Sequence, residues 1–147
     1  MAGKKLTFSS VEVGDELPAV VRECTQENIW RNAAGSLDYN PVHTDPEWVR
    51  TAQPFGIPQT VAHGMMTMSA MASVVSDWAY PVQGEIRSMD SKFVKPVTAG
   101  STIECSGIVS SKHFIRSGED FVVVDLKAEN QDGDVVAVGQ AEVILPD

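Results

Sequence analysis

A stretch without proline and rich in Ala and Met spans Val61–Trp78. Nearly every face of the corresponding helix would carry small or apolar side chains, which predicts a long helix buried on most sides. Four β-branched segments follow it: Ile86–Val94, Thr102–Ser110, Phe121–Ala128 and Val135–Leu145. A long buried helix followed by consecutive strands predicts an α+β fold, in which a curved antiparallel β-sheet wraps around the helix.

The residues before the long helix are richer in turn formers. Phe8–Leu17 alternates loosely and contains a glycine, which predicts a short strand or a turn. Thr25 has the side chain of a helix N-cap, and a helix is expected to run from there to about Ala34. Gly35 is expected to end this helix, and Ser36–Pro41 is predicted to form a loop.

Two dipeptides mark further boundaries. Asp45-Pro46 predicts the start of a second helix, with Asp45 or the preceding Thr44 as its cap and proline at the first helical position. This helix is expected to end before Pro54 and to lie near the N-terminal end of the long helix. Asp132-Gly133 predicts a tight hairpin turn between the last two strands.

The length of 147 residues fits one domain, expected to span 1–147, and a hydrophobic content of 43% is sufficient for an ordinary core. Eleven Lys and Arg against 20 Asp and Glu give a formal charge of -9. A surface this acidic repels phosphate backbones and anionic lipid headgroups, so neither nucleic acid nor a membrane is expected as a partner. An anionic ligand would need a local basic patch.

The cysteines and the N-terminus point to a cytoplasmic protein. Cys24 and Cys105 lie far apart and fit no redox or metal-binding spacing, so two reduced thiols are expected. Met1–Phe8 has a basic pair but no apolar run after it, and therefore no signal peptide is expected. The apolar stretch Met65–Val75 is interrupted by Thr and Ser and is too short to span a bilayer.

The segment Ser36–Asp45 combines an acid and a histidine five residues apart, in a loop stiffened by Asn40-Pro41. At this spacing Asp38 and His43 can converge on one point. A carboxylate beside an imidazole can divide the proton transfers of a reaction between the two groups. From spacing alone a structural explanation stays open, in which Asp38 forms an Asx turn and His43 caps the next helix.

Ala62-His63-Gly64-Met65 stands at the start of the long helix. Glycine costs about 1 kcal/mol relative to alanine inside a helix, so Gly64 is explained if a ligand must approach the backbone closely. Unpaired N–H groups at a helix N-terminus can stabilise a developing oxyanion. Packing is an equal explanation for Gly64, and for His63 a buried, hydrogen-bonded histidine is favoured over a direct catalytic role.

These motifs occur together in a known family. Asp38–Asp45 (Asp-Tyr-Asn-Pro-Val-His-Thr-Asp) resembles the hydratase motif of the MaoC-like, (R)-specific enoyl-CoA hydratase and dehydratase family. Leu37 departs from the glycine that usually precedes the acid. Phe55-Gly56 with Val61–Thr67 resembles a second signature of this family. Lys92–Val97 with Gly100–Ile103 resembles a third signature, which is less specific. Their order and spacing agree, so the resemblance covers nearly the whole chain.

The resemblance implies a single hot-dog domain, usually dimeric, that hydrates trans-2-enoyl thioesters to (R)-3-hydroxyacyl thioesters or catalyses the reverse dehydration. Asp38 and His43 would hold the reacting water, and the Gly64 N–H would receive the thioester oxygen. Asn40 and His63 would have supporting roles. Which of the acid and the histidine acts as the base stays open, since a coupled pair titrates as a unit. No metal or other cofactor is implied.

By the same resemblance the substrate is an acyl-CoA or acyl-carrier-protein thioester. Met65 suits contact with an acyl chain because methionine is adaptable, although core packing is the favoured explanation for the methionines of this helix. Lys92 and Lys95 are expected on one strand face beside Arg87, with Phe93 pointing inward, where they would meet carrier phosphates. A solvated strand face is the alternative.

Other functions stay compatible with the motifs. A homodimer is expected, and a heterodimer with a related hot-dog subunit is an alternative, in which this chain would be the catalytic half because it has both the acid and the histidine. A hot-dog thioesterase would share the fold but place its carboxylate elsewhere. A non-catalytic acyl-binding or transcriptional module is disfavoured by the intact motif and the charge of -9.

Overall fold

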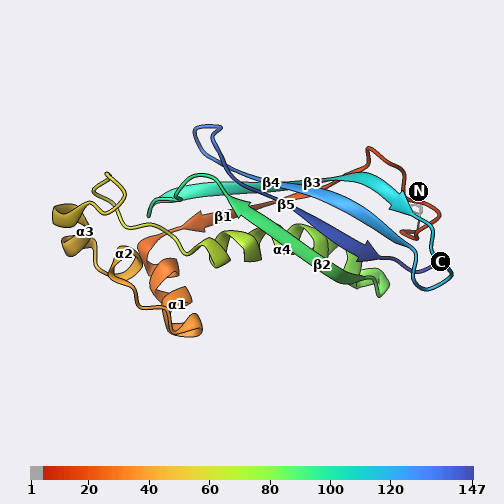
Figure 1. Ribbon diagram of the computed structural model, residues 1–147, viewed down its shortest axis with the longest axis horizontal. Helices are drawn as coiled ribbons and strands as arrows, with labels where there is room; N and C mark the ends of the chain where they lie inside the picture. The colour runs from red at the N-terminus through yellow and green to blue at the C-terminus, as the bar shows by residue number, and fades with distance from the viewer. Residues whose placement is uncertain (1–4) are drawn as a thin grey trace.

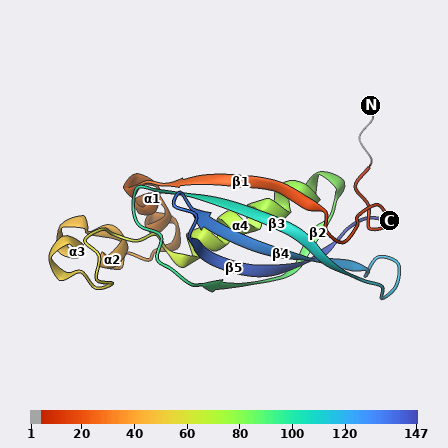
Figure 2. The same cartoon turned by 90° about the horizontal axis from the view of Figure 1, so that it is seen from above.

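The computed structural model describes residues 5–147, in which a five-stranded antiparallel sheet curves around one long helix (Figures 1 and 2). The strands are β1 Glu16–Cys24, β2 Glu85–Phe93, β3 Ser101–His113, β4 Phe121–Asn130 and β5 Val135–Ile144, in the sheet order β1-β3-β4-β5-β2. The helices are α1 Gln26–Ser36, α2 Pro41–Thr44, α3 Pro46–Ala52 and α4 Gly64–Ala79, with the short 3-10 helix η1 Tyr80–Val82. This is the expected α+β hot-dog arrangement.

Helix α4 fills the concave side of the sheet. Its fully buried side chains are Thr67, Ala70, Met71, Val74, Val75 and Ala79. They join the valines, alanines and isoleucines of the strands in one hydrophobic cluster. Met65, Ser69 and Asp77 remain exposed, so the helix has one open side and the expectation of burial on most sides was only partly right.

The last four strands match the predicted segments to within a few residues. Strands β3 and β4 alternate between core and solvent along much of their length. The expected turn between the last two strands is confirmed, with Gly133 at φ 80°. Cys24 and Cys105 are unpaired and buried, as expected for reduced thiols.

Of the two possibilities expected for Phe8–Leu17, a short strand or a turn, the structure forms the turn. Residues 8–10 form a turn, and β1 begins only at Glu16. Its buried residues are Leu17, Val20 and Cys24, without a period of two, because the pairing with β3 shifts between Leu17 and Val20. An edge strand with such an irregularity has no alternating sequence pattern.

Helix α1 begins as expected, with the Thr25 hydroxyl accepting a hydrogen bond from the Asn28 N–H at 3.1 Å. The expectation that Gly35 ends the helix was wrong, since α1 continues to Ser36 and Leu37 takes the left-handed conformation with φ 60°. Leu37 therefore stands where glycine is usual, and it turns the chain directly before Asp38.

Beyond the N-terminal end of α4 lie α2 and α3 (Figure 1). The one-turn helix α2 was not expected; the Asn40 side chain caps it by accepting from the Val42 N–H. Helix α3 begins at Pro46 with Asp45 as its cap, as expected. Within residues 5–147, no helix has both the length and the apolar character needed to cross a membrane.

Candidate active site

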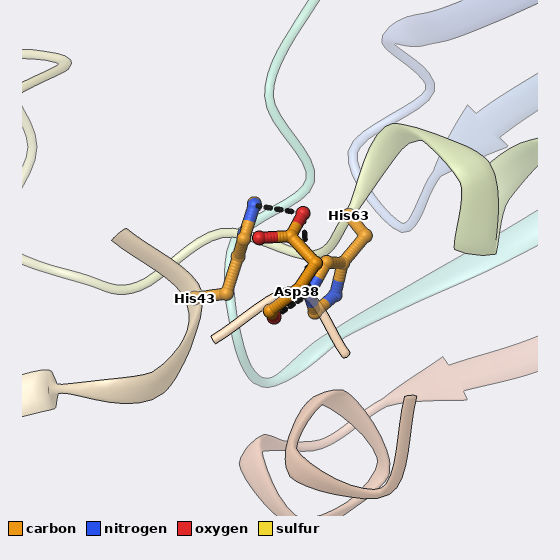
Figure 3. Close-up of side chains that lie close together, drawn as sticks. All are labelled: Asp38, His43 and His63. Carbon is orange, nitrogen blue, oxygen red and sulfur yellow. Dashed lines mark hydrogen bonds and ion pairs between the residues drawn. The ribbon is translucent and has the colours of Figure 1, made fainter. Parts of the chain in front are cut away.

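Three side chains from separate segments meet at the N-terminus of α4: Asp38, His43 and His63. The Oδ2 atom of Asp38 lies 3.9 Å from the Nε2 atom of His43 and 3.9 Å from the Nε2 atom of His63. Figure 3 shows the aspartate beside both imidazoles. The structure thus brings the expected acid and histidine together and adds a second histidine to them.

The orientation of His43 is fixed by its backbone-facing nitrogen. Nδ1 lies 2.7 Å from the carbonyl oxygen of Val61. Since a carbonyl only accepts, Nδ1 carries the proton and donates it, and Nε2 presents a lone pair toward Asp38. Only 14% of the His43 side chain is exposed, so this lone pair faces a largely enclosed space.

Asp38 uses its two carboxylate oxygens differently. Oδ1 accepts from the Asn40 N–H at 3.3 Å, which is the Asx turn that the spacing left open. Oδ2 faces the histidines. The structural explanation for Asp38 is therefore correct, and it is compatible with a carboxylate aimed at His43. The other structural explanation is wrong, because Asp45 rather than His43 caps α3.

Helix α1 holds the backbone next to His43. The Gln26 Nε2–H donates to the His43 carbonyl at 2.8 Å, and the Thr60 hydroxyl donates to the Gln26 Oε1 atom. The Trp30 Nε1–H donates to the Thr44 carbonyl at 2.9 Å. The sequence analysis missed these positioning contacts, because they join residues 14 to 34 positions apart.

Gly64 is the first residue of α4, and His63 before it provides no side-chain cap. Within residues 5–147 the Gly64 N–H donates no hydrogen bond. This free donor is one of the groups that a helix leaves unpaired at its N-terminus, where the helix dipole favours negative charge.

Two cavities meet at this point. One of about 360 Å³ has mostly apolar walls. It is lined by His43, Phe55, Val61, Ala62, Gly64, Thr67, Phe93, Val94, Lys95, Pro96, Val97 and Val136. The other, of about 640 Å³, is more polar. It is lined by Arg31, Asn32, Gly35, Ser36, Asp38, His43, His63, Gly64, Met65 and Ser69. His43 and Gly64 border both cavities.

The expected basic strand face is not formed. The ring of Phe93 is 46% exposed but lies against Gly64 at the start of α4. Strand β2 ends at Phe93, so Lys95 lies beyond the strand and does not share a strand face with Lys92. Lys95 pairs with Asp134 at 2.9 Å, and its hydrogen bond and charge lower the pKa of that carboxyl. Arg87 pairs with Glu142 instead.

Asp38, His43 and His63 could also hold a metal ion, since one ligand atom from each lies within 4.8 Å of the others. Two imidazoles with one carboxylate suit a first-row transition metal. The hydrogen bonding of His63 opposes it: the His63 Nε2 atom lies 3.0 Å from the Asp38 carbonyl oxygen, which only accepts, so this nitrogen is inferred to carry a proton.

A curved antiparallel sheet around one long helix defines a protein with the hot-dog fold. Comparison with known families agrees. The family described as MaoC like domain matches residues 8–131, and the chain belongs to this family.

Two curated relatives are dehydratases. The mitochondrial 3-hydroxyacyl-[acyl-carrier-protein] dehydratase of Arabidopsis thaliana is 30% identical over 148 residues, which cover 95% of this chain and 84% of that protein. The 3-hydroxyacyl-thioester dehydratase X of Mycobacterium tuberculosis is 37% identical over 86 residues, 58% of this chain. The match spans only 28% of that longer protein.

The fold is also shared with a solved structure, the unliganded R-hydratase PhaJ1 from Pseudomonas aeruginosa. The TM-score is 0.83 at 24% sequence identity, and the match covers 96% of this chain and 86% of that one.

Proposed function

We propose that this chain, as a single domain over 1–147, catalyses the reversible addition of water to trans-2-enoyl thioesters, giving (R)-3-hydroxyacyl thioesters. Residues 1–4 of that span lie outside the described part of the chain. The observation that carries the proposal is the pairing of the Asp38 carboxylate with the free Nε2 atom of His43, beside the unpaired N–H of Gly64.

The distance of 3.9 Å between Asp38 Oδ2 and His43 Nε2 is too long for a direct hydrogen bond. One water between these atoms can donate a hydrogen to each, because both are acceptors. Its oxygen is then free to attack Cβ of the substrate. One water proton passes to the pair and the pair delivers a proton to Cα, so the substrate gains H and OH overall.

Gly64 is the proposed oxyanion donor. When water adds to Cβ, negative charge develops on the thioester oxygen, and an N–H at the start of a 16-residue helix stabilises it. Gly64 borders both cavities, which supports a thioester carbonyl at their junction. The two ends of the substrate then occupy the two cavities.

We assign the phosphates of the carrier to the rim of the cavity that includes Lys95, because Lys92 precedes Lys95 by three residues and both lysines are exposed. The acyl chain would contact Met65, on the border of the other cavity. Met65 is 62% exposed, so it is available for contact with the acyl chain rather than being used in the core.

Association with a second hot-dog subunit is part of the proposal. Strand β2 is an edge of the sheet, and its outer backbone groups have no neighbouring strand within residues 5–147. Pairing with a second copy, or with a related subunit, would cover this edge. In a heterodimer this chain would be the catalytic half, because it has both Asp38 and His43.

The test is the loss of enoyl-thioester absorbance when the purified protein meets crotonyl-CoA or a longer enoyl-CoA, after dialysis against a chelator. Asp38→Asn and His43→Ala are each expected to lower kcat by at least about a hundredfold. Asp45→Asn is the matched control, since this carboxylate caps α3 and lies two residues beyond His43.

Circular dichroism and size-exclusion chromatography would establish that each variant remains folded and associated. Absence of turnover by folded wild-type protein, with both substrates, would overturn the proposal. Release of free thiol instead of loss of the double bond would favour the thioesterase alternative.

A further inference from the structure

The second histidine of the site, His63, has a contact that neither the motif nor the proposed reaction uses. Only 4% of its side chain is exposed. Nε2 lies 3.0 Å from the backbone carbonyl oxygen of Asp38, 25 residues earlier in the chain. Nδ1 is buried and has no hydrogen-bond partner within residues 5–147.

These contacts identify the proton position on His63. The Asp38 carbonyl only accepts, so Nε2 carries the proton and donates it. A second proton on Nδ1 would place an unpaired donor in a buried position, which is costly. The ring is therefore in its Nε2–H form, with a lone pair on Nδ1.

The same ring also supports His43. The two imidazoles stack with centroids 3.9 Å apart and planes inclined by 28°. The Nδ1–H of His43 donates to Val61, two residues before His63. The short buried segment Val61–His63 thus contacts both members of the pair: it binds the backbone of Asp38 and it orients the ring of His43.

The other contacts of Asp38 hold it less closely. Its carboxylate accepts from the Asn40 N–H at 3.3 Å, and its own N–H donates to the Ser36 hydroxyl at 3.4 Å. Both partners are exposed: Ser36 is the last residue of α1, and Asn40 caps α2. Among the hydrogen bonds of Asp38 found in residues 5–147, the one from His63 is the shortest and joins it to the buried start of α4.

We propose that His63 is a positioning residue, which in its Nε2–H form holds the Asp38 carbonyl and thereby sets the distance between the Asp38 carboxylate and His43 Nε2. This inference rests on the proposed hydratase function. A misplacement of reacting groups by about 1 Å can cost a hundredfold in rate, so one hydrogen bond to the backbone of the acid has a large effect on catalysis.

The test compares His63→Gln with His63→Met. The two side chains have nearly the same length and both remove the ring stack on His43, but only glutamine has an N–H that reaches the position of Nε2. We expect His63→Met to lower kcat by about a hundredfold with KM changed less than about threefold. The kcat of His63→Gln should be at least about tenfold higher than that of His63→Met.

Equal kcat values for the two variants, both folded, would overturn the role of the donated hydrogen bond. A folded His63→Met protein with wild-type kcat would overturn the positioning role altogether.

A second measurement does not depend on activity and so separates this inference from the proposed function. Long-range proton–nitrogen NMR of histidine-labelled wild-type protein is expected to show His63 protonated at Nε2 and unprotonated at Nδ1. A proton on Nδ1 would overturn the assignment, even if the protein is an active hydratase. An Nε2–H signal in a protein without hydratase activity would leave the contact intact and contradict only the proposed function.

Discussion

The ring of Phe93 lies directly against Gly64. A Cβ built on Gly64 would come 3.0 Å from Cε2 and 3.1 Å from Cδ2 of this ring. Phe93 is the last residue of β2, and Gly64 is the first residue of α4. The edge strand and the central helix therefore meet at the proposed oxyanion donor, where an added methyl group would have to displace an aromatic ring.

We expect Gly64→Ala to lower kcat/KM by about tenfold or more, because the displaced Phe93 ring disturbs the junction of the two cavities. In the double variant Gly64→Ala/Phe93→Leu, the smaller side chain should recover part of this loss. Steady-state kinetics with crotonyl-CoA measure both effects.

Gly35→Ala is the matched control. Gly35 lies in α1 and a Cβ there would meet nothing within 4 Å. Gly35 borders the more polar cavity, but the added methyl group would contact no other atom, so this variant should keep its kcat. It should gain about 0.5–1 kcal/mol of unfolding free energy, since alanine favours a helix. If Gly64→Ala were as active as Gly35→Ala, the contact with Phe93 would be irrelevant to catalysis.

Gln26→Leu is expected to reduce kcat, because it leaves the His43 carbonyl and the Thr60 hydroxyl without their partner. The unfolding free energy should fall by about 1–3 kcal/mol. Asn28→Leu is the control on the same helix, since it removes a side-chain bond to the Glu23 carbonyl outside the site. Equal kcat values for the two variants would argue against positioning of His43 by α1.

Lys95→Ala should raise KM for a CoA thioester about threefold to tenfold with little change in kcat, since a charge-assisted contact to a phosphate is lost. The wild-type KM should also rise with ionic strength. Lys127→Ala is the control, because Lys127 is similarly exposed and paired, with Glu129 on β4. A rise in KM with Arg31→Ala but not with Lys95→Ala would place the carrier in the other cavity.

The buried thiols should weaken the fold at alkaline pH. Burial raises the pKa of Cys105 from 9.0 to about 11, and it also raises the pKa of Cys24. Between pH 9.0 and about pH 11 the unfolded chain has lost the Cys105 proton while the folded chain retains it. The free energy of unfolding therefore falls as the pH rises through this range. Below about pH 9 this contribution is fully present.

Urea unfolding at pH 8 and pH 10.5 tests this. The wild-type protein should lose about 2 kcal/mol more than Cys105→Ala between the two pH values. Identical losses in the two proteins would show that the Cys105 thiol does not contribute to the fall in unfolding free energy at alkaline pH.

Much of the fold follows from local patterns. Strands β3, β4 and β5 are rich in β-branched residues and lie between turn formers. Helix α3 begins at an Asp45-Pro46 pair whose cap and first residue act within one turn. Strand β1 could not be predicted in this way, since it is an irregular edge strand whose burial depends on its pairing with β3. The end of α1 was also missed, because Leu37 rather than Gly35 takes the left-handed conformation.

The sequence by itself indicated that Asp38 and His43 can converge, because the two lie five residues apart with the Asn40-Pro41 pair between them. Only the tertiary structure decided what surrounds them. His63 reaches the Asp38 carbonyl across 25 residues. The contact of Phe93 with Gly64 and the pairing of Lys95 with Asp134 also join distant segments. No local periodicity encodes these contacts, because they depend on how α4 packs against the sheet and where β2 ends.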